Sequence, residues 1–234
     1  MNFSTRSFEK ELLDRNDIPF EDIIQNMKEL DFINKYLGGH KISITGVRSL
    51  LTKPRFRNGK ILICEIGCGG GDNLRVIRQF CCKQNISAEF TGIDINPHCI
   101  EFARSRKENE SIRFLASDYK LVKFDQKPDI IFSSLFTHHF DDSEVVEILR
   151  WMNRNSTAGF FINDLHRHPV AYYSIKWLTK IFSTSYLVKN DASLSVLRGF
   201  RKKELIDFKN QAAIRGLQVK WKWAFRWLLI HSNA

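Results

Sequence analysis

The stretch of this chain that decides its fold is Glu65-Ile66-Gly67-Cys68-Gly69-Gly70-Gly71-Asp72-Asn73. A short apolar run at 61–66 leads into it, which is typical of a parallel strand buried on both faces. A helical pattern begins at Asp72, so the glycines form the turn between a strand and a helix. In an open α/β sheet such a turn lies at the carboxyl edge of the strands, where these folds bind their ligands.

The same order of strand and helix repeats after this turn. Strands are expected at 90–95, 112–116, 129–135 and 159–162, and helices at 72–83, 97–107, 143–153 and 170–182. This alternation predicts a parallel sheet covered by helices. After Phe200 a further helix is expected to about Arg215, and the chain closes with strands at 217–223 and 225–231. These two are joined too tightly for parallel pairing, so we predict an antiparallel hairpin.

The predicted fold class is therefore α/β, with a doubly wound, Rossmann-like, seven-stranded and mostly parallel sheet. Residues 60–234 form this unit, and residues 1–59 precede it as a helical extension. Pro19 suits a first helical turn, and Gly38-Gly39 ends the helical pattern, with a shorter helix expected at 44–51. The extension carries an apolar stripe that needs a partner surface, so we predict a lid over the ligand pocket. Its members are Phe20, Ile23, Ile24, Met27, Leu30, Ile33 and Leu37.

Composition narrows the class of protein further. The chain has 234 residues, 43% of them hydrophobic and 26% charged, which is ordinary for a globular domain. No apolar run reaches the roughly 18 residues that a membrane-spanning helix needs, and the N-terminus lacks the apolar core of a signal peptide. The five cysteines show no CxxC pair and no zinc spacing, so we expect reduced thiols, no metal site and a cytoplasmic protein.

The formal net charge of +10 points to an anionic partner such as nucleic acid, anionic lipid or an acidic carrier protein. Basic residues gather at Lys53, Arg55, Arg57 and Lys60, and again between 198 and 226. The plainer interpretation is that these are solvated faces of a basic protein, and charge balance alone does not decide between the two.

The charges around the glycine turn limit the ligand that it binds. A dinucleotide fingerprint that starts at Gly67 would need a small residue where Asp72 stands. Glu65 and Asp72 would also place negative charge beside a pyrophosphate, which is unfavourable. No P-loop pattern is present. A ligand with an ammonium and a sulfonium group suits these carboxylates, and S-adenosylmethionine is such a ligand.

The segment Glu65 to Gly71 resembles the first motif of class I S-adenosylmethionine-dependent methyltransferases, E/D-x-G-x-G-x-G. The resemblance implies that Asp94, at the end of the second strand, holds the ribose hydroxyls. It also implies that the end of the third strand meets the adenine and that the end of the fourth lies beside the methyl group. The cofactor-binding residues expected on this basis are Glu65, Gly67, Cys68, Gly69, Asn73, Asp94, Ile95, Ser117, Asp118, Tyr119 and Ser134.

Within that class the chain resembles the small-molecule branch related to the methyltransferases of ubiquinone and menaquinone biosynthesis. The similar segments are 30–39, Ser134 to Phe140 and Asn163 to Arg167. This resemblance implies a small aromatic, polyketide-like or quinone-like acceptor, free or bound to a carrier. S-adenosylhomocysteine would be the second product. We expect transfer to a hydroxyl oxygen, with methylation of an activated ring carbon as an alternative.

Deprotonation makes a hydroxyl a far better acceptor, and histidine is the natural base near pH 7. His139, His138 and His166, in that order, are the expected catalytic residues because they follow the fourth and fifth strands at the carboxyl edge. No helical HExxH spacing appears, so no metal is expected. An aromatic wall around the acceptor is expected from Phe136, Phe140, Tyr172, Tyr173 and Trp177.

Nucleic acid is the competing class of acceptor. Enzymes that methylate base amino groups resemble one another in an Asn/Asp-Pro-Pro-Tyr motif, but Ser133-Ser134-Leu135-Phe136 occupies that position here. Cytosine C5 chemistry needs a nucleophilic cysteine, usually after proline, and no such pair exists. Methylation of nucleic-acid bases is thus disfavoured, while methylation of RNA ribose or of protein through the basic surface stays open.

Overall fold

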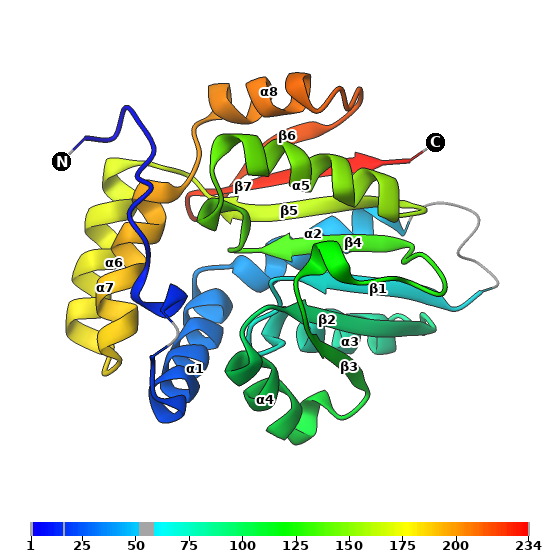
Figure 1. Ribbon diagram of the computed structural model, residues 1–234, viewed down its shortest axis with the longest axis horizontal. Coiled ribbons are helices and arrows are strands. Elements are labelled where there is room, and N and C mark those ends of the chain that lie inside the picture. The colour runs from blue at the N-terminus through cyan, green and yellow to red at the C-terminus, as the bar shows by residue number, and fades with distance from the viewer. Residues whose placement is uncertain (1, 16, 52–58, 234) are drawn as a thin grey trace.

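The computed structural model describes residues 2–15, 17–51 and 59–233 of the chain (Figure 1). Lys53, Arg55 and Arg57 of the predicted basic cluster lie outside the described residues. Within them, seven strands form one sheet in the order β3-β2-β1-β4-β5-β7-β6. The predicted α/β fold class is confirmed.

Five strands of the sheet are parallel, namely β1 (Ile61–Ile66), β2 (Ala88–Asp94), β3 (Ile112–Ala116), β4 (Ile130–Ser134) and β5 (Gly159–Leu165). The predicted hairpin is made by β6 (Gln218–Lys222) and β7 (Arg226–Ser232). β7 lies between β5 and β6 and pairs antiparallel with both. The start of β7 therefore lies beside the carboxyl end of β5, with Arg226 opposite Leu165.

Helices cover both faces of the sheet because successive side chains of a strand point to opposite faces. Phe161 packs in the core cluster that contains α2 (Gly39–Leu50), α3 (Asp72–Lys83) and α4 (Pro97–Ser105). Its neighbour Phe160 packs in the other cluster, with α5 (Asp142–Asn155) and α8 (Lys202–Gln211). In Figure 1, α5 lies in front of the sheet and α2 behind it.

Three helices stand beyond the carboxyl ends of the parallel strands, namely α1 (Phe20–Tyr36), α6 (Pro169–Phe182) and α7 (Tyr186–Arg198) (Figure 1). α7 contacts both α1 and α6. The N-terminal segment runs along α7 and contains the short 3-10 helix η1 (Leu12–Asp14). No helix in the described parts of the chain combines the length and apolarity that a membrane crossing requires.

The structure divides the predicted N-terminal extension into two parts. α2 begins at Gly39, earlier than expected, and Val47 and Leu50 are fully buried in the core of the sheet. A Cβ added at Gly46 would lie 2.5 Å from the ring of Phe161, so this helix is packed tightly on β5. α2 is therefore part of the sheet's covering layer, and only the residues before it are placed to act as a lid.

Candidate active site

A cavity of about 1280 Å³ opens at the carboxyl end of the strands. The glycine turn after β1 and the ends of β2 and β4 form its floor, while α1, α6, α7 and the N-terminal segment form its walls. Eight of the expected cofactor residues line it: Glu65, Gly67, Cys68, Gly69, Asn73, Asp94, Ile95 and Ser134.

Backbone conformation and a close approach fix the shape of the glycine turn. Gly67 has φ +65°, a left-handed conformation, and an added Cβ would lie 2.0 Å from the ring of Phe136. A side chain at this position would therefore strain the backbone and displace the wall of the cavity. The Gly69 N–H donates to Asp94 Oδ2 at 2.8 Å, which ties the turn to the end of β2.

The turn is lined by carboxylates, as the sequence predicted. Glu65 is fully buried, and its Oε2 atom has no hydrogen-bond partner. Burial, together with the charges of Asp72 and Asp94, raises the pKa of Glu65 well above its usual range. Burial alone would raise the pKa of Asp72 as well, but hydrogen bonds from His40 and Asn34 lower it. A buried carboxyl without an ion-pair partner fits the ammonium group of S-adenosylmethionine, which would supply that ion pair.

The end of β3 is placed differently from the other strand ends. Ser117, Asp118 and Tyr119 are not among the described residues that line the cavity. The Asp118 side chain caps the following 3-10 turn by accepting from the Lys120 N–H at 2.9 Å. Tyr119 packs edge-on against Phe136. Their role in adenine binding stays a prediction.

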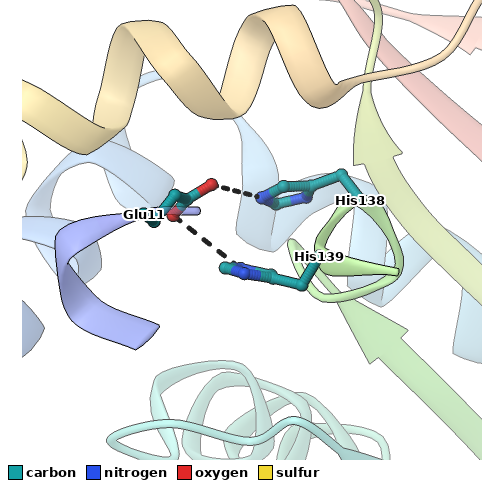
Figure 2. Close-up of side chains that lie close together, drawn as sticks. All are labelled: Glu11, His138 and His139. Carbon is teal, nitrogen blue, oxygen red and sulfur yellow. Dashed lines mark ion pairs between the residues drawn. The ribbon is translucent and has the colours of Figure 1, made fainter. Parts of the chain in front are cut away.

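The two neighbouring histidines come from the short 3-10 helix η5 (Thr137–His139) that follows β4. His138 Nδ1 lies 2.7 Å from Asp164 Oδ1 on β5, and its Nε2 lies 3.4 Å from Glu11 Oε1. Figure 2 shows Glu11 of the N-terminal segment facing both rings, with one carboxylate oxygen toward each. His139 Nε2 lies 3.8 Å from the other oxygen of this carboxylate, and its Nδ1 lies 3.1 Å from Asp14 Oδ1.

Charge separates the roles that these two histidines can take. Burial alone would lower the pKa of His138, but the carboxylates of Asp164 and Glu11 outweigh it and raise the pKa to about 9. His138 is therefore protonated at neutral pH and has no lone pair with which to accept a proton. Its side chain is only 2% exposed, whereas that of His139 is 22% exposed at the cavity wall. Of the pair, His139 is the ring that a ligand can reach.

Two buried arginines hold the turn that carries the histidines. Arg198 donates from Nε to His138 O at 3.1 Å and from Nη2 to His139 O at 2.7 Å. Arg6 donates to Phe140 O at 2.9 Å and forms an ion pair with Asp142 at 2.6 Å. Because Arg6 belongs to the N-terminal segment, the same contacts that fix the turn also fix that segment.

A second set of contacts places η1 over the cavity. Asp191 on α7 accepts from the backbone N–H groups of Leu12 and Leu13, at 2.8 and 3.0 Å. Ser195 on the same helix donates to Glu11 Oε1 at 2.8 Å. The residues of the N-terminal segment that meet the histidines are thus positioned by α7.

His166 is not brought to the cavity. Its ring accepts a hydrogen bond from Trp221 Nε1 at 3.2 Å, and it does not belong to the described lining. Burial and nearby positive charge, His168 first, lower its pKa to about 4. His166 is a weak base, and it lies outside the cavity.

The expected aromatic wall is only partly formed. Phe136 and Phe140 line the cavity. α6 presents Ile175 and Leu178 to it instead of the expected aromatic residues, so Tyr173 and Trp177 lie exposed on the helix's outer face. Tyr172 is buried against Phe3.

Two clusters of side chains have the spacing of metal ligands. The ligand atoms of Glu11, His138 and His139 lie within 4.8 Å of one another, and so do those of a second cluster, Asp31, His40 and Asp72. Each cluster contains a histidine that is already paired with a carboxylate, namely His138 with Asp164 and His40 with Asp72. The expectation that the site needs no metal stays a prediction.

Comparison with known proteins finds a family match for the central part of the chain. The model of a family described as a methyltransferase domain matches residues 63–159. This match spans less than half of the chain, and over these residues the chain is similar to methyltransferases. The match covers the glycine turn, the ends of the first four strands and the histidine pair.

Solved structures share the fold of this chain at low identity. A plantazolicin methyltransferase bound to a desmethyl plantazolicin analogue and S-adenosylhomocysteine superposes with a TM-score of 0.60. It is 18% identical, over 86% of this chain and 72% of that one. Human N-acetylserotonin methyltransferase with bound S-adenosylmethionine gives a TM-score of 0.63 at 16% identity, over 92% of this chain and 56% of that one.

One curated relative matches over a shorter stretch. A malonyl-[acyl-carrier protein] O-methyltransferase of Priestia megaterium (strain DSM 319 / IMG 1521) is 29% identical over 79 residues. The match covers 34% of this chain and 27% of that protein, so it spans about a quarter of this relative's length.

Several polar residues come to the cavity from distant segments that the sequence does not mark as part of a site. Glu11 and Asp14 lie in the N-terminal segment, and Arg226 lies at the start of β7. None of them belongs to a motif or to an amphipathic pattern. The nearest signal is the pair of acids three residues apart in Glu11-Leu12-Leu13-Asp14, which alone does not indicate a site.

The His138–Asp164 pair makes stability depend on pH. The pKa of His138 is raised from 6.5 to about 9, so its stabilising effect is complete below pH 6.5 and is lost as pH rises through 9. The pKa of Asp164 is lowered from 3.8 to about 2, so its effect is complete above pH 3.8 and is lost as pH falls through 2. The pair is therefore most stabilising between about pH 3.8 and pH 6.5, where both contributions are complete.

We expect His138→Gln to lower the free energy of unfolding by about 3–5 kcal/mol near pH 6, the usual cost of breaking a buried ion pair. The deficit should shrink as pH rises through 9. Urea denaturation of both proteins from pH 5 to pH 10 measures it. A deficit that does not change over this range would mean that the pair carries no net charge on the histidine.

Proposed function

We propose that this protein transfers the methyl group of S-adenosylmethionine to a hydroxyl oxygen of a small molecule held in the cavity. The observation that carries the proposal is His139, a histidine at the cavity wall whose ring lies beside Asp14. S-adenosylmethionine supplies an activated methyl group on a sulfonium, so the protein's task is to orient the acceptor and to remove its proton.

His139 is the base in this proposal. With Nδ1 facing Asp14 Oδ1 at 3.1 Å, the carboxylate favours the tautomer that carries its proton on Nδ1. Nε2, which lies 3.8 Å from Glu11 Oε2, then keeps a lone pair that can accept the proton of an acceptor hydroxyl. His138 cannot take this role because the carboxylates of Asp164 and Glu11 keep it protonated.

The apolar side chains that line the cavity, together with its few polar groups, favour a small, mostly apolar acceptor. Leu30 and Ile33 of α1 face the cavity, as do Ile175 and Leu178 of α6. The polar groups gather at the glycine turn and at the histidine pair, as is common in pockets for small ligands. The curated relative methylates a malonyl group on a carrier protein, and an acceptor held on a carrier agrees with a basic surface.

Closure of the cavity by residues 2–15 and α1 completes the proposal. Ile23 and Met27 of α1 are buried against Cys99 and Phe102 of α4, which fixes this wall to the sheet domain. A wall that excludes water strengthens the interactions of charged groups inside the site. The proposed lid is thus the N-terminal segment together with α1.

Substitution of Asp94 tests whether the cofactor binds where the proposal places it. Its two oxygens accept from the N–H groups of Gly69 and Asn96, at 2.8 and 2.9 Å, and each oxygen keeps a lone pair for a ribose hydroxyl. We expect Asp94→Ala to weaken binding of S-adenosylhomocysteine by about 1.5–3 kcal/mol, the range for hydrogen bonds to a charged group. Isothermal titration calorimetry measures this.

Asp129→Ala is the matched control. Asp129 accepts from the Leu62 N–H at 3.0 Å and from the Thr157 hydroxyl at 2.7 Å, at the opposite end of the sheet. Its loss should leave cofactor affinity unchanged. If both variants bind the cofactor as the parent does, Asp94 is a structural capping residue and not part of the site.

A further inference from the structure

Arg226 is a buried cation without a carboxylate partner. Its side chain is 3% exposed, its Nη1 atom has no hydrogen-bond partner, and it lines the cavity. The other buried arginines of the described chain, Arg6, Arg75, Arg167 and Arg198, each have a carboxylate oxygen within 4.0 Å. A buried charge without a counter-ion costs several kcal/mol, so its retention beside a cavity calls for an anionic ligand.

The surroundings of Arg226 place that ligand near the glycine turn. Asn34 accepts from Arg226 Nη2 at 3.1 Å and donates to Asp72 Oδ2 at 3.1 Å. Asp72 is the first residue of α3, directly after the glycines. The guanidinium group and the carboxyl of Glu65, which both lack ion-pair partners, therefore face the same end of the cavity.

Charges of both signs around one end of a cavity are complementary to a zwitterion. The acids nearest to Arg226 are Asp72 and Asp164, and both are already paired, with His40 at 2.8 Å and with His138 at 2.7 Å. Neither forms an ion pair with the guanidinium group within 4.0 Å. An α-amino acid would place its ammonium at Glu65 and its carboxylate at Arg226.

We propose that Arg226 binds a ligand carboxylate in this cavity, and from its position we assign the α-carboxylate of the methyl donor. The inference rests on the proposed cofactor function. A carboxylate on the acceptor is the other source of the same chemistry. Arginine suits the task because its planar fork matches both oxygens of a carboxylate.

The test compares ligands with and without the carboxylate, by calorimetry on the full chain. The probes are S-adenosylhomocysteine and decarboxylated S-adenosylmethionine, which keeps the amine. Arg226→Met should weaken the first by about 10- to 100-fold, the scale for a hydrogen-bonded ion pair, and should change the second by less than about threefold. Arg226→Lys, which keeps the charge, should fall between the parent and Arg226→Met.

Thermal unfolding of the ligand-free variants separates binding from folding. Removing a buried charge that has no partner should leave the melting temperature of Arg226→Met equal to that of the parent or higher. Arg167→Met is the matched control, because Arg167 is equally buried but ion-paired with Glu204. It should unfold at a lower temperature and weaken both ligands equally.

The remaining outcomes decide which ligand supplies the carboxylate and whether the proposal is correct. If the donor analogues bind Arg226→Met normally, while 4-hydroxybenzoate stabilises only the parent and phenol stabilises neither, the carboxylate belongs to the acceptor. Equal loss of both donor analogues, or no change with any probe, would overturn the proposal. A parent protein that fails to bind S-adenosylhomocysteine would instead refute the proposed function itself.

Discussion

Replacing His139 with alanine should lower kcat by about 10²–10⁴-fold and leave the Kd of S-adenosylhomocysteine unchanged, since that is the usual effect of losing a general base. His139 faces the cavity, and Asp14 orients its ring. Among the described residues, no hydrogen bond or ion pair joins His139 to the glycine turn, so cofactor binding should survive. Single-turnover rates with saturating donor measure the chemical step separately from product release.

His166→Ala is the control for this prediction, because His166 follows a neighbouring strand but is bound to Trp221 away from the cavity. It should keep a near-normal rate. Asp14→Asn should cost less than His139→Ala, because it weakens the orientation of the base without removing it. If His139→Ala keeps the parent rate with a hydroxyl acceptor, the base assignment is wrong, and methylation of an activated ring carbon becomes the better account.

Deleting residues 2–15 should lower turnover by at least about 10²-fold while cofactor binding persists. The deletion removes Asp14 from the base and Glu11 from the ion pairs that surround His138. It also opens the wall of the cavity to water, which weakens the electrostatics of the site. Rate measurement and calorimetry on the same preparation check both halves of the prediction.

A deletion through residue 50 would not isolate this effect, because it also removes the buried residues Val47 and Leu50 of α2 from the core. Asp191→Asn offers a gentler test, since Asp191 is the acceptor that holds η1 on α7. It should lower the rate less than the deletion does. A shortened chain that turns over at the parent rate would refute the lid.

The fold was largely predictable from sequence because the patterns that mark its strands, helices and turns are local and periodic. The apolar strand at 61–66 and the glycine turn after it mark the ligand edge, and the remaining strands follow in order. α7 was missed because the buried polar residues Asp191 and Arg198 interrupt its apolar pattern. The sequence predicts too late a start for α2, because a Gly-Gly pair is typical of a helix end, whereas Gly39 begins the next helix.

The site was predictable only where it follows a motif. Glu65, Asp94 and Ser134 lie at strand ends, and the structure brings them to the cavity together. The difference between His138 and His139 depends on Glu11, more than a hundred residues away in the chain, and on Asp164. Arg226 reaches the cavity because β7 runs antiparallel beside β5, which no local pattern reveals.

The most direct test of the central claim uses S-adenosylmethionine carrying a carbon-13 methyl group, incubated with a panel of phenols, hydroquinones, carrier-bound acids and transfer RNA. We predict stoichiometric formation of S-adenosylhomocysteine and of a methylated small molecule whose labelled carbon has the chemical shift of a methoxy group. A labelled carbon bonded to ring carbon or nitrogen, or label found only in transfer RNA, would contradict the account.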